Sequence, residues 1–144
     1  MASQSVIPML AYENGPEAMD WLAKAFGFRE LDRQVDGGRL THGELDTGGG
    51  GVVMLATPSV HYRGPKRHRE ECEIARGWHD VPYIIDGVLV YVDDVDAHFE
   101  RAKANGATIL SPVEGKRYRA EDLEGHRWMF MQSESHNLDA KRPR

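Results

Sequence analysis

The sequence contains a single cysteine, Cys72, among its 144 residues, so no pair exists for an intrachain disulfide. A chain without disulfides suits a reducing compartment, and we expect a cytoplasmic protein. Residues 1–5 lack the basic and apolar pattern of a signal peptide, and no apolar run approaches the roughly 18 residues that cross a membrane. The formal net charge is -5 and no basic stripe stands out, which argues against a nucleic-acid or membrane partner.

Several common site signatures are also missing. No two histidines stand at the H-x-x-x-H spacing of a helical metal site. The glycine run Gly48–Gly51 leads into a strand candidate, whereas a phosphate loop opens onto a helix with Lys and Ser or Thr, so it predicts a hairpin turn. Cys72 lies among mixed charges with no activating neighbour, which argues against a cysteine nucleophile.

What the chain does have is an order of elements that occurs twice. In residues 87–132 the apolar run Val88–Val92 predicts a strand, and a helical pattern follows that Asp94 can cap and Gly106 can end. Three further strand candidates come next, separated by glycine and acidic turn residues. They are Thr108–Leu110, Arg117–Ala120 and Trp128–Gln132. Trp128 and Phe130 alternate with Met129, so these two rings share the opposite face of their strand.

Residues 5–57 show the same order. The strand candidate Val6–Tyr12 precedes a helix that Asn14 can cap and Gly27 can end. Three strand candidates again follow: Phe28–Gln34, Arg39–Asp46 and Gly51–Thr57. We therefore predict one α+β domain over residues 1–144 that contains two βαβββ repeats. Its parts are repeat 1 at 5–57, a connecting segment at 58–86, repeat 2 at 87–132 and a flexible tail at 133–144.

The connecting segment has a different character. In its run KRHREECE, at 66–73, opposite charges stand four residues apart and can pair along a helix. The pairs are Lys66 with Glu70, Arg67 with Glu71 and Arg69 with Glu73. Two interpretations stay open: a solvated helical segment, or a lid over a pocket. The lid would carry His61, Tyr62, Arg63 and Trp78.

The doubled βαβββ order resembles the vicinal oxygen chelate superfamily, which includes glyoxalase I, bleomycin-resistance proteins and extradiol dioxygenases. Three segments carry the resemblance: AFGF at 25–28, VYVDDVDAHFERAKANGA at 90–107 and EDLEGHRWMF at 121–130. The ending GHRWMF is most similar to the PhnB-like, glyoxalase-related branch. The resemblance implies two half-open sheets that form a ligand-holding cup, and its members have many different activities.

Metal-dependent members of this superfamily hold a divalent ion with His, Gln or Glu at four equivalent strand positions. Those positions fall here at Ile7, Met54, Gly87 and Met129. None of these residues offers an oxygen or imidazole side-chain donor, and a methionine thioether does not suit an oxygen-rich site. We therefore expect no metal at these positions and no cofactor.

One polar pair stands out on a predicted strand. His42 and Glu44 are two residues apart, so both side chains point to the same face. A structural pair, a polar contact to a ligand and a metal or acid–base role all stay open for them. The resemblance places nine residues at the cup. The apolar ones are Ile7, Met9, Met54, Leu89 and Met129, and the polar ones are His42, Glu44, Tyr118 and Arg119. With Met129 at the cup, the alternating Trp128 and Phe130 are expected to face the helices and form core.

The leading hypothesis is a small-molecule-binding protein of the glyoxalase and bleomycin-resistance type, with an apolar or mixed ligand in the cup. The resemblance implies a homodimer whose pockets are shared between two chains. The first alternative is a glyoxalase-like lyase or isomerase, or a dioxygenase, that uses His42 and Glu44 with or without a divalent metal. The second is a module whose cup is filled by its own side chains.

Overall fold

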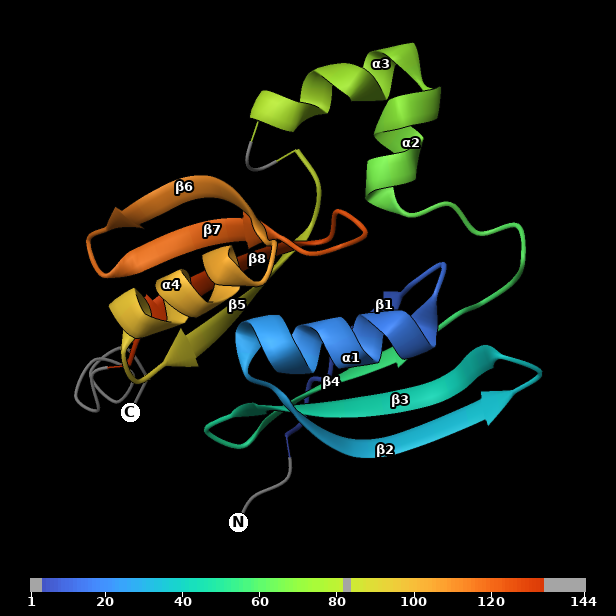
Figure 1. Ribbon diagram of the computed structural model, residues 1–144, viewed down its shortest axis with the longest axis horizontal. Helices are drawn as coiled ribbons and strands as arrows, with labels where there is room; N and C mark the ends of the chain where they lie inside the picture. The colour runs from blue at the N-terminus through green and yellow to red at the C-terminus, as the bar shows by residue number, and fades with distance from the viewer. Residues whose placement is uncertain (1–3, 82–83, 134–144) are drawn as a thin grey trace.

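The computed structural model describes residues 4–81 and 84–133, and it contains two βαβββ modules joined by a helical connection (Figure 1). Module 1 consists of β1 (Met9–Ala11), α1 (Gly15–Phe26), β2 (Arg29–Asp36), β3 (Arg39–Gly48) and β4 (Gly51–Ala56). Module 2 consists of β5 (Gly87–Val92), α4 (Val95–Ala104), β6 (Thr108–Glu114), β7 (Arg117–Glu121) and β8 (Arg127–Gln132). The predicted α+β fold with two repeats is confirmed. Of the predicted flexible tail, all but Ser133 lies outside the described residues.

Each module forms one four-stranded sheet, and the two sheets have the same topology. Sheet A has the order β1-β4-β3-β2 and sheet B the order β5-β8-β7-β6. In each sheet the first strand pairs in parallel with the fourth, and the remaining pairs are antiparallel. The predicted hairpin at Gly48–Gly51 joins β3 to β4, where Gly49 and Gly50 adopt positive φ angles.

The two longer helices begin and end where the sequence predicts. The Asn14 side chain accepts a hydrogen bond from the N–H of Glu17, and Gly27 ends α1 with a φ of 75°. The Asp94 side chain accepts one from the N–H of Ala97 at the start of α4. Both helices pack on one side of their own sheet and contact each other, so that side of each sheet belongs to one core.

Strand alternation decides which side chains enter that core. Trp128 and Phe130 are 1% and 0% exposed, and their rings contact Phe26 of module 1, so the prediction that they form core is confirmed. Met129, between them in β8, points to the other side of sheet B. We call the side of each sheet away from α1 and α4 its open face.

Buried polar groups join the two modules. The Tyr12 hydroxyl of module 1 donates a hydrogen bond of 2.6 Å to Asp122 of module 2, and the Trp128 indole donates one of 3.0 Å to the same carboxylate. Burial raises the pKa of Asp122, and burial together with the neighbouring Asp122 raises that of Tyr12. The Glu124 carboxylate accepts hydrogen bonds from the N–H groups of residues 13 and 14. This turn of module 2 therefore holds the corner between β1 and α1.

A second contact between the modules runs through His98 of α4. Its Nε2 lies 2.9 Å from the Phe26 carbonyl, which only accepts, so Nε2 carries the proton. Its Nδ1, 2.6 Å from the Tyr118 hydroxyl, then accepts a hydrogen bond from that group. Burial lowers the pKa of His98, which favours this neutral form. His98 is therefore half-buried at the contact between the two modules, although it lies on a surface helix.

The connection contains α2 (Pro65–Glu71), α3 (Glu73–Arg76) and the short 3₁₀ helix η1 (Gly77–Asp80). Its charges pair differently from the sequence prediction. Arg67 pairs with Glu13 of module 1, and Arg69, which is only 9% exposed, pairs with Glu121 of module 2. The predicted pairing of these arginines along their own helix is therefore wrong, because their side chains reach other elements.

Glu121 lies between two buried arginines. Its Oε1 accepts a hydrogen bond of 2.8 Å from Arg69, and its Oε2 accepts one of 2.8 Å from Nε of Arg127. The Arg127 guanidinium also donates to the carbonyls of Trp78 and Val81. This cluster, Arg69–Glu121–Arg127, fixes the connection to the end of sheet B. None of the helices among the described residues is long and apolar enough to cross a membrane.

Candidate functional site

The strand registers give the two open faces equivalent rows of side chains. Across sheet A, Met9 pairs with Met54, Met54 with Glu44, and Glu44 with Asp32. Across sheet B the corresponding row is Leu89, Met129, Arg119 and Ser111. Directly paired residues of neighbouring strands point to the same side, so each row lies on one face. In both rows two apolar side chains come first and two polar ones follow.

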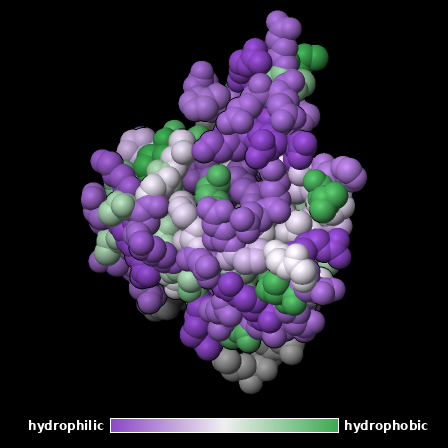
Figure 2. All heavy atoms as spheres, turned by 45° about the vertical axis from the view of Figure 1, so that its right-hand side comes forward, coloured by the Kyte–Doolittle hydropathy of each residue, from purple (hydrophilic) through white to green (hydrophobic). Residues whose placement is uncertain are grey.

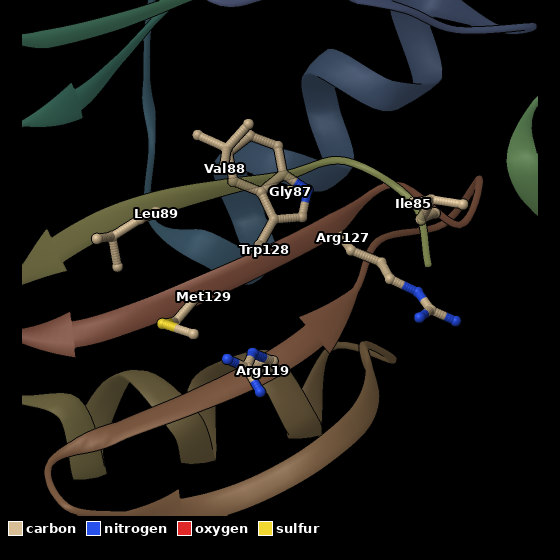
Figure 3. Close-up of a pocket in the computed structure, with 8 residues that line it drawn as sticks. All are labelled: Ile85, Gly87, Val88, Leu89, Arg119, Arg127, Trp128 and Met129. Atoms are coloured by element: carbon tan, nitrogen blue, oxygen red, sulfur yellow. The ribbon is translucent and has the colours of Figure 1, made fainter. Parts of the chain in front are cut away.

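The open face of sheet B contains a hollow of about 320 Å³ (Figure 3). Leu89 of β5 and Met129 of β8 lie side by side on it, and Arg119 of β7 lies beyond Met129. Ile85 and Arg127 line the end nearest the connection, while Val88 and Trp128 point to the other side of the sheet. An apolar floor with a guanidinium at its margin suits a ligand of mixed polarity.

The open face of sheet A carries the polar pair that the sequence singles out. His42 Nε2 lies 3.2 Å from Glu44 Oε1, and both side chains are partly exposed. Asp32 of β2 joins them, because one potential ligand atom from each of the three residues lies within 4.8 Å of the others. The sequence analysis misses Asp32, since only the register of β2 against β3 shows that it faces Glu44.

The apolar residues at the predicted cup fall into two sets. Met9 and Met54 lie on the open face of sheet A, and Leu89 and Met129 lie on that of sheet B. Ile7 comes before β1, and Gly87 lies opposite Arg127 at the start of β5. Met54 and Met129 therefore pair with Met9 and Leu89. Each of these two partners lies two residues further along the chain than the position that the sequence suggests, Ile7 in module 1 and Gly87 in module 2.

Tyr118 corrects one sequence prediction. It is fully buried, its ring packs against Phe99 and Phe130, and its hydroxyl bonds to His98. Strand alternation explains the difference: Arg119 points to the open face, so Tyr118 next to it points to the helices. It belongs to the core and not to the predicted polar contacts.

One residue of the lid predicted in the connection lines a second hollow. Tyr62 lines a cavity of about 220 Å³ together with Met9, Asp86 and His126. His61 and Arg63 are exposed, and Trp78 stacks on His68 within the connection. The connection is thus attached beside both hollows, and its closure over a ligand stays a prediction.

Hydrophobic residues on the side that Figure 2 shows occur in small groups among hydrophilic ones. The most exposed large side chains of the rows are Met9, 81% exposed, and Leu89, 47% exposed. Single exposed apolar residues are common on protein surfaces. Met9 and Leu89, however, occupy equivalent positions in the two sheets. We therefore regard the open faces of both sheets as candidate binding surfaces.

The four positions that the family resemblance gives for metal ligands do not fit a divalent ion. They carry Ile7, Met54, Gly87 and Met129, and the strand partners of the two methionines are Met9 and Leu89. Methionine is a soft donor, and the isoleucine, leucine and glycine side chains offer no donor, so these positions suit an apolar ligand better than an ion. The expectation of no metal at this place stays a prediction.

Comparison with known proteins identifies the family of the chain. A family model described as "Glyoxalase/Bleomycin resistance protein/Dioxygenase superfamily" matches residues 7–130. No curated protein matches the chain. Among solved structures, TioX from Micromonospora sp. ML1 is 37% identical with a TM-score of 0.64, and the alignment covers 91% of this chain and 97% of that one.

Two more distant structures share the fold. TnmS3, described as an antibiotic binding protein from Streptomyces sp. CB03234, is 19% identical with a TM-score of 0.62, covering 93% of this chain and 99% of that one. The fosfomycin resistance protein FosX from Mesorhizobium loti is 15% identical with a TM-score of 0.60, covering 98% and 100%.

Proposed function

Since the chain belongs to the Glyoxalase/Bleomycin resistance protein/Dioxygenase superfamily, we propose that it binds a small molecule of apolar or mixed character on the open faces of its sheets. The observation that carries this proposal is the pair of equivalent rows that begin with Met9 and Met54 and with Leu89 and Met129. Apolar side chains that helices leave uncovered gain free energy when a ligand removes them from water.

The relatives support a binding role for this fold. TnmS3 is described as an antibiotic binding protein and FosX as a fosfomycin resistance protein. In this chain the methionines add a property of their own, because an unbranched thioether side chain adapts to ligands of irregular shape. Polar groups in the third place of each row, Glu44 in one sheet and Arg119 in the other, would orient the ligand.

The proposed binding site lies between two copies of the chain. One copy buries the helix-covered sides of both sheets in a shared core, so each open face is half of a cup. A second copy can close such a half-cup with an open face of its own and bury the exposed Met9 side chain. This agrees with the homodimer that the family resemblance implies.

We expect the chain to sediment as a dimer at micromolar concentration, and Met9→Lys to sediment as a monomer, because a lysine ammonium on the open face would lose its hydration in the interface. Sedimentation velocity on both proteins measures this. Ile74→Lys is the matched control, since Ile74 is 81% exposed on α3, away from both open faces, and that variant should stay dimeric. A monomeric unsubstituted chain would contradict the shared site.

Ligand binding itself can be measured with Nile red, a neutral apolar dye. We expect saturable fluorescence enhancement by the unsubstituted chain, and a dissociation constant raised about tenfold or more in Leu89→Lys, since burial of one leucine is worth about 1.5–3 kcal/mol. Ile74→Lys should bind the dye as the unsubstituted chain does. Equal affinities in the two variants would show that the dye does not use the open face of sheet B.

A catalytic function is the second proposal, and one observation favours it. Asp32 lies beside His42 and Glu44, which gives the pair a third polar group. A lyase, isomerase or dioxygenase of this superfamily could use such a cluster for proton transfer or with a divalent ion.

A further inference from the structure

Three side chains with metal-binding groups converge on the open face of sheet A. Asp32 of β2 and Glu44 of β3 are direct cross-strand partners, and His42 precedes Glu44 by two residues on the same side of β3. They therefore come from two adjacent strands whose backbone hydrogen bonds fix their spacing. This is a more rigid support than a loop would give.

The geometry fits one ion. Potential ligand atoms of the three residues all lie within 4.8 Å of one another, and His42 Nε2 stands 3.2 Å from Glu44 Oε1. Nitrogen and oxygen ligands bind zinc at about 2.0–2.2 Å, so two ligands of one ion stand roughly 3–3.5 Å apart. The His42–Glu44 pair already has this separation, and a ligand atom of Asp32 lies within 4.8 Å of those of the other two residues.

The electrostatics of the strand pair favour a cation independently of that geometry. Two carboxylates that face each other directly across a strand pair repel, which destabilises the sheet. Within residues 4–81 and 84–133, no Arg or Lys forms a salt bridge with Asp32 or Glu44. The Asp32 carboxylate accepts a hydrogen bond of 3.1 Å from the amide of Gln34, a neutral group that orients it without cancelling its charge.

We propose that Asp32, His42 and Glu44 bind one divalent transition-metal ion, with zinc as the representative case. One imidazole and two carboxylates are a donor set that Zn²⁺, Mn²⁺ and Fe²⁺ accept. The site lies on β2 and β3, whereas the metal positions of this superfamily lie on the first and fourth strands of each module. The proposal rests on these three side chains and does not depend on the small-molecule function above.

Three protein ligands would leave at least one position of a four-coordinate ion open. Met54 is the direct strand partner of Glu44, so the ion would lie beside the apolar part of the same row. A molecule resting on Met9 and Met54 could then place an oxygen on the ion. The ion would then bind a polar group of the small molecule on sheet A, a role that the residues at the superfamily's own metal positions cannot fill in this chain.

Isothermal titration of the chelator-treated protein with Zn²⁺ tests the site, with the absorption spectrum of bound Co²⁺ as a second readout of the ligand set. We expect one ion per chain, and affinity at least about tenfold weaker in each of Asp32→Asn, His42→Ala and Glu44→Gln. His79→Ala is the matched control. His79 pairs with Asp80 at 2.9 Å on the exposed surface, so it resembles the His42 pair without a third ligand, and its loss should leave the affinity unchanged.

Two results would overturn the proposal: no saturable zinc binding below millimolar concentration, or equal binding by the unsubstituted chain and the three variants. The three positions are partly exposed and each substitution is small, so the variants should fold. Circular dichroism melting curves confirm folding before each titration. Because the titration needs no organic ligand, its outcome is independent of whether the open faces bind a small molecule.

Discussion

Replacing Glu121 by alanine is expected to lower the free energy of unfolding by about 3–5 kcal/mol, as measured by urea denaturation followed by circular dichroism. Glu121 is the only acid in the cluster Arg69–Glu121–Arg127, and all three side chains are buried. Without it, two guanidinium groups stay in the interior with no counter-charge, and Arg127 keeps only its carbonyl partners in the connection.

The exposed pair of Arg29 and Asp46, with a separation of 2.9 Å, provides the matched control. Arg29→Ala removes an equally short ion pair from the surface, and the expected cost is at most about 1 kcal/mol, because water and salt screen that interaction. A loss for Glu121→Ala that is no larger than the loss for Arg29→Ala would show that the buried cluster does not hold the connection.

The second large expected effect is a difference in unfolding free energy between substitutions of two neighbouring residues on opposite sides of β8. Phe130→Ala should cost about 3–5 kcal/mol of unfolding free energy, because it leaves a cavity among Phe26, Phe28 and Tyr118. Met129→Ala should cost about 1 kcal/mol or less, since its side chain lies on the open face, where solvent already reaches it. The same urea titrations measure both variants.

This comparison tests the assignment of faces as well as the packing. If Met129→Ala destabilised the protein as much as Phe130→Ala does, Met129 would be a core residue and the open face of sheet B would be filled by the protein itself. That outcome would support the module with a self-filled cup and contradict a ligand-binding face.

The fold could be predicted because its signals are local. Asn14 and Gly27 bound one helix, Asp94 and Gly106 bound the other, and the same order of elements occurs twice. Alternation places Trp128 and Phe130 opposite Met129, and the family resemblance, which puts Met129 at the cup, makes their side the core.

The site could be predicted less well because it depends on contacts between strands. Asp32 faces Glu44 only through a register that contains a bulge, and no pattern within β2 reveals it. Tyr118 was placed on the wrong side because its strand was aligned to the family and not to its own alternation. Arg69 and Glu121 are 52 residues apart, so helical spacing pointed Arg69 to the wrong partner. The ligand, the PhnB-like branch and the cytoplasmic location stay predictions.

One difference between the duplicated modules bears on how two copies would recognise each other. Glu44 and Arg119 occupy the same place in their rows, so a duplicated position carries opposite charges in the two sheets. A two-fold axis that brought like sheets together would oppose carboxylate to carboxylate and guanidinium to guanidinium. An axis that paired sheet A with sheet B would bring Glu44 and Arg119, of opposite charge, onto facing sheets in both halves of the dimer. This difference in charge between the two rows would thus give the assembly its orientation as well as the polarity of its ligand site.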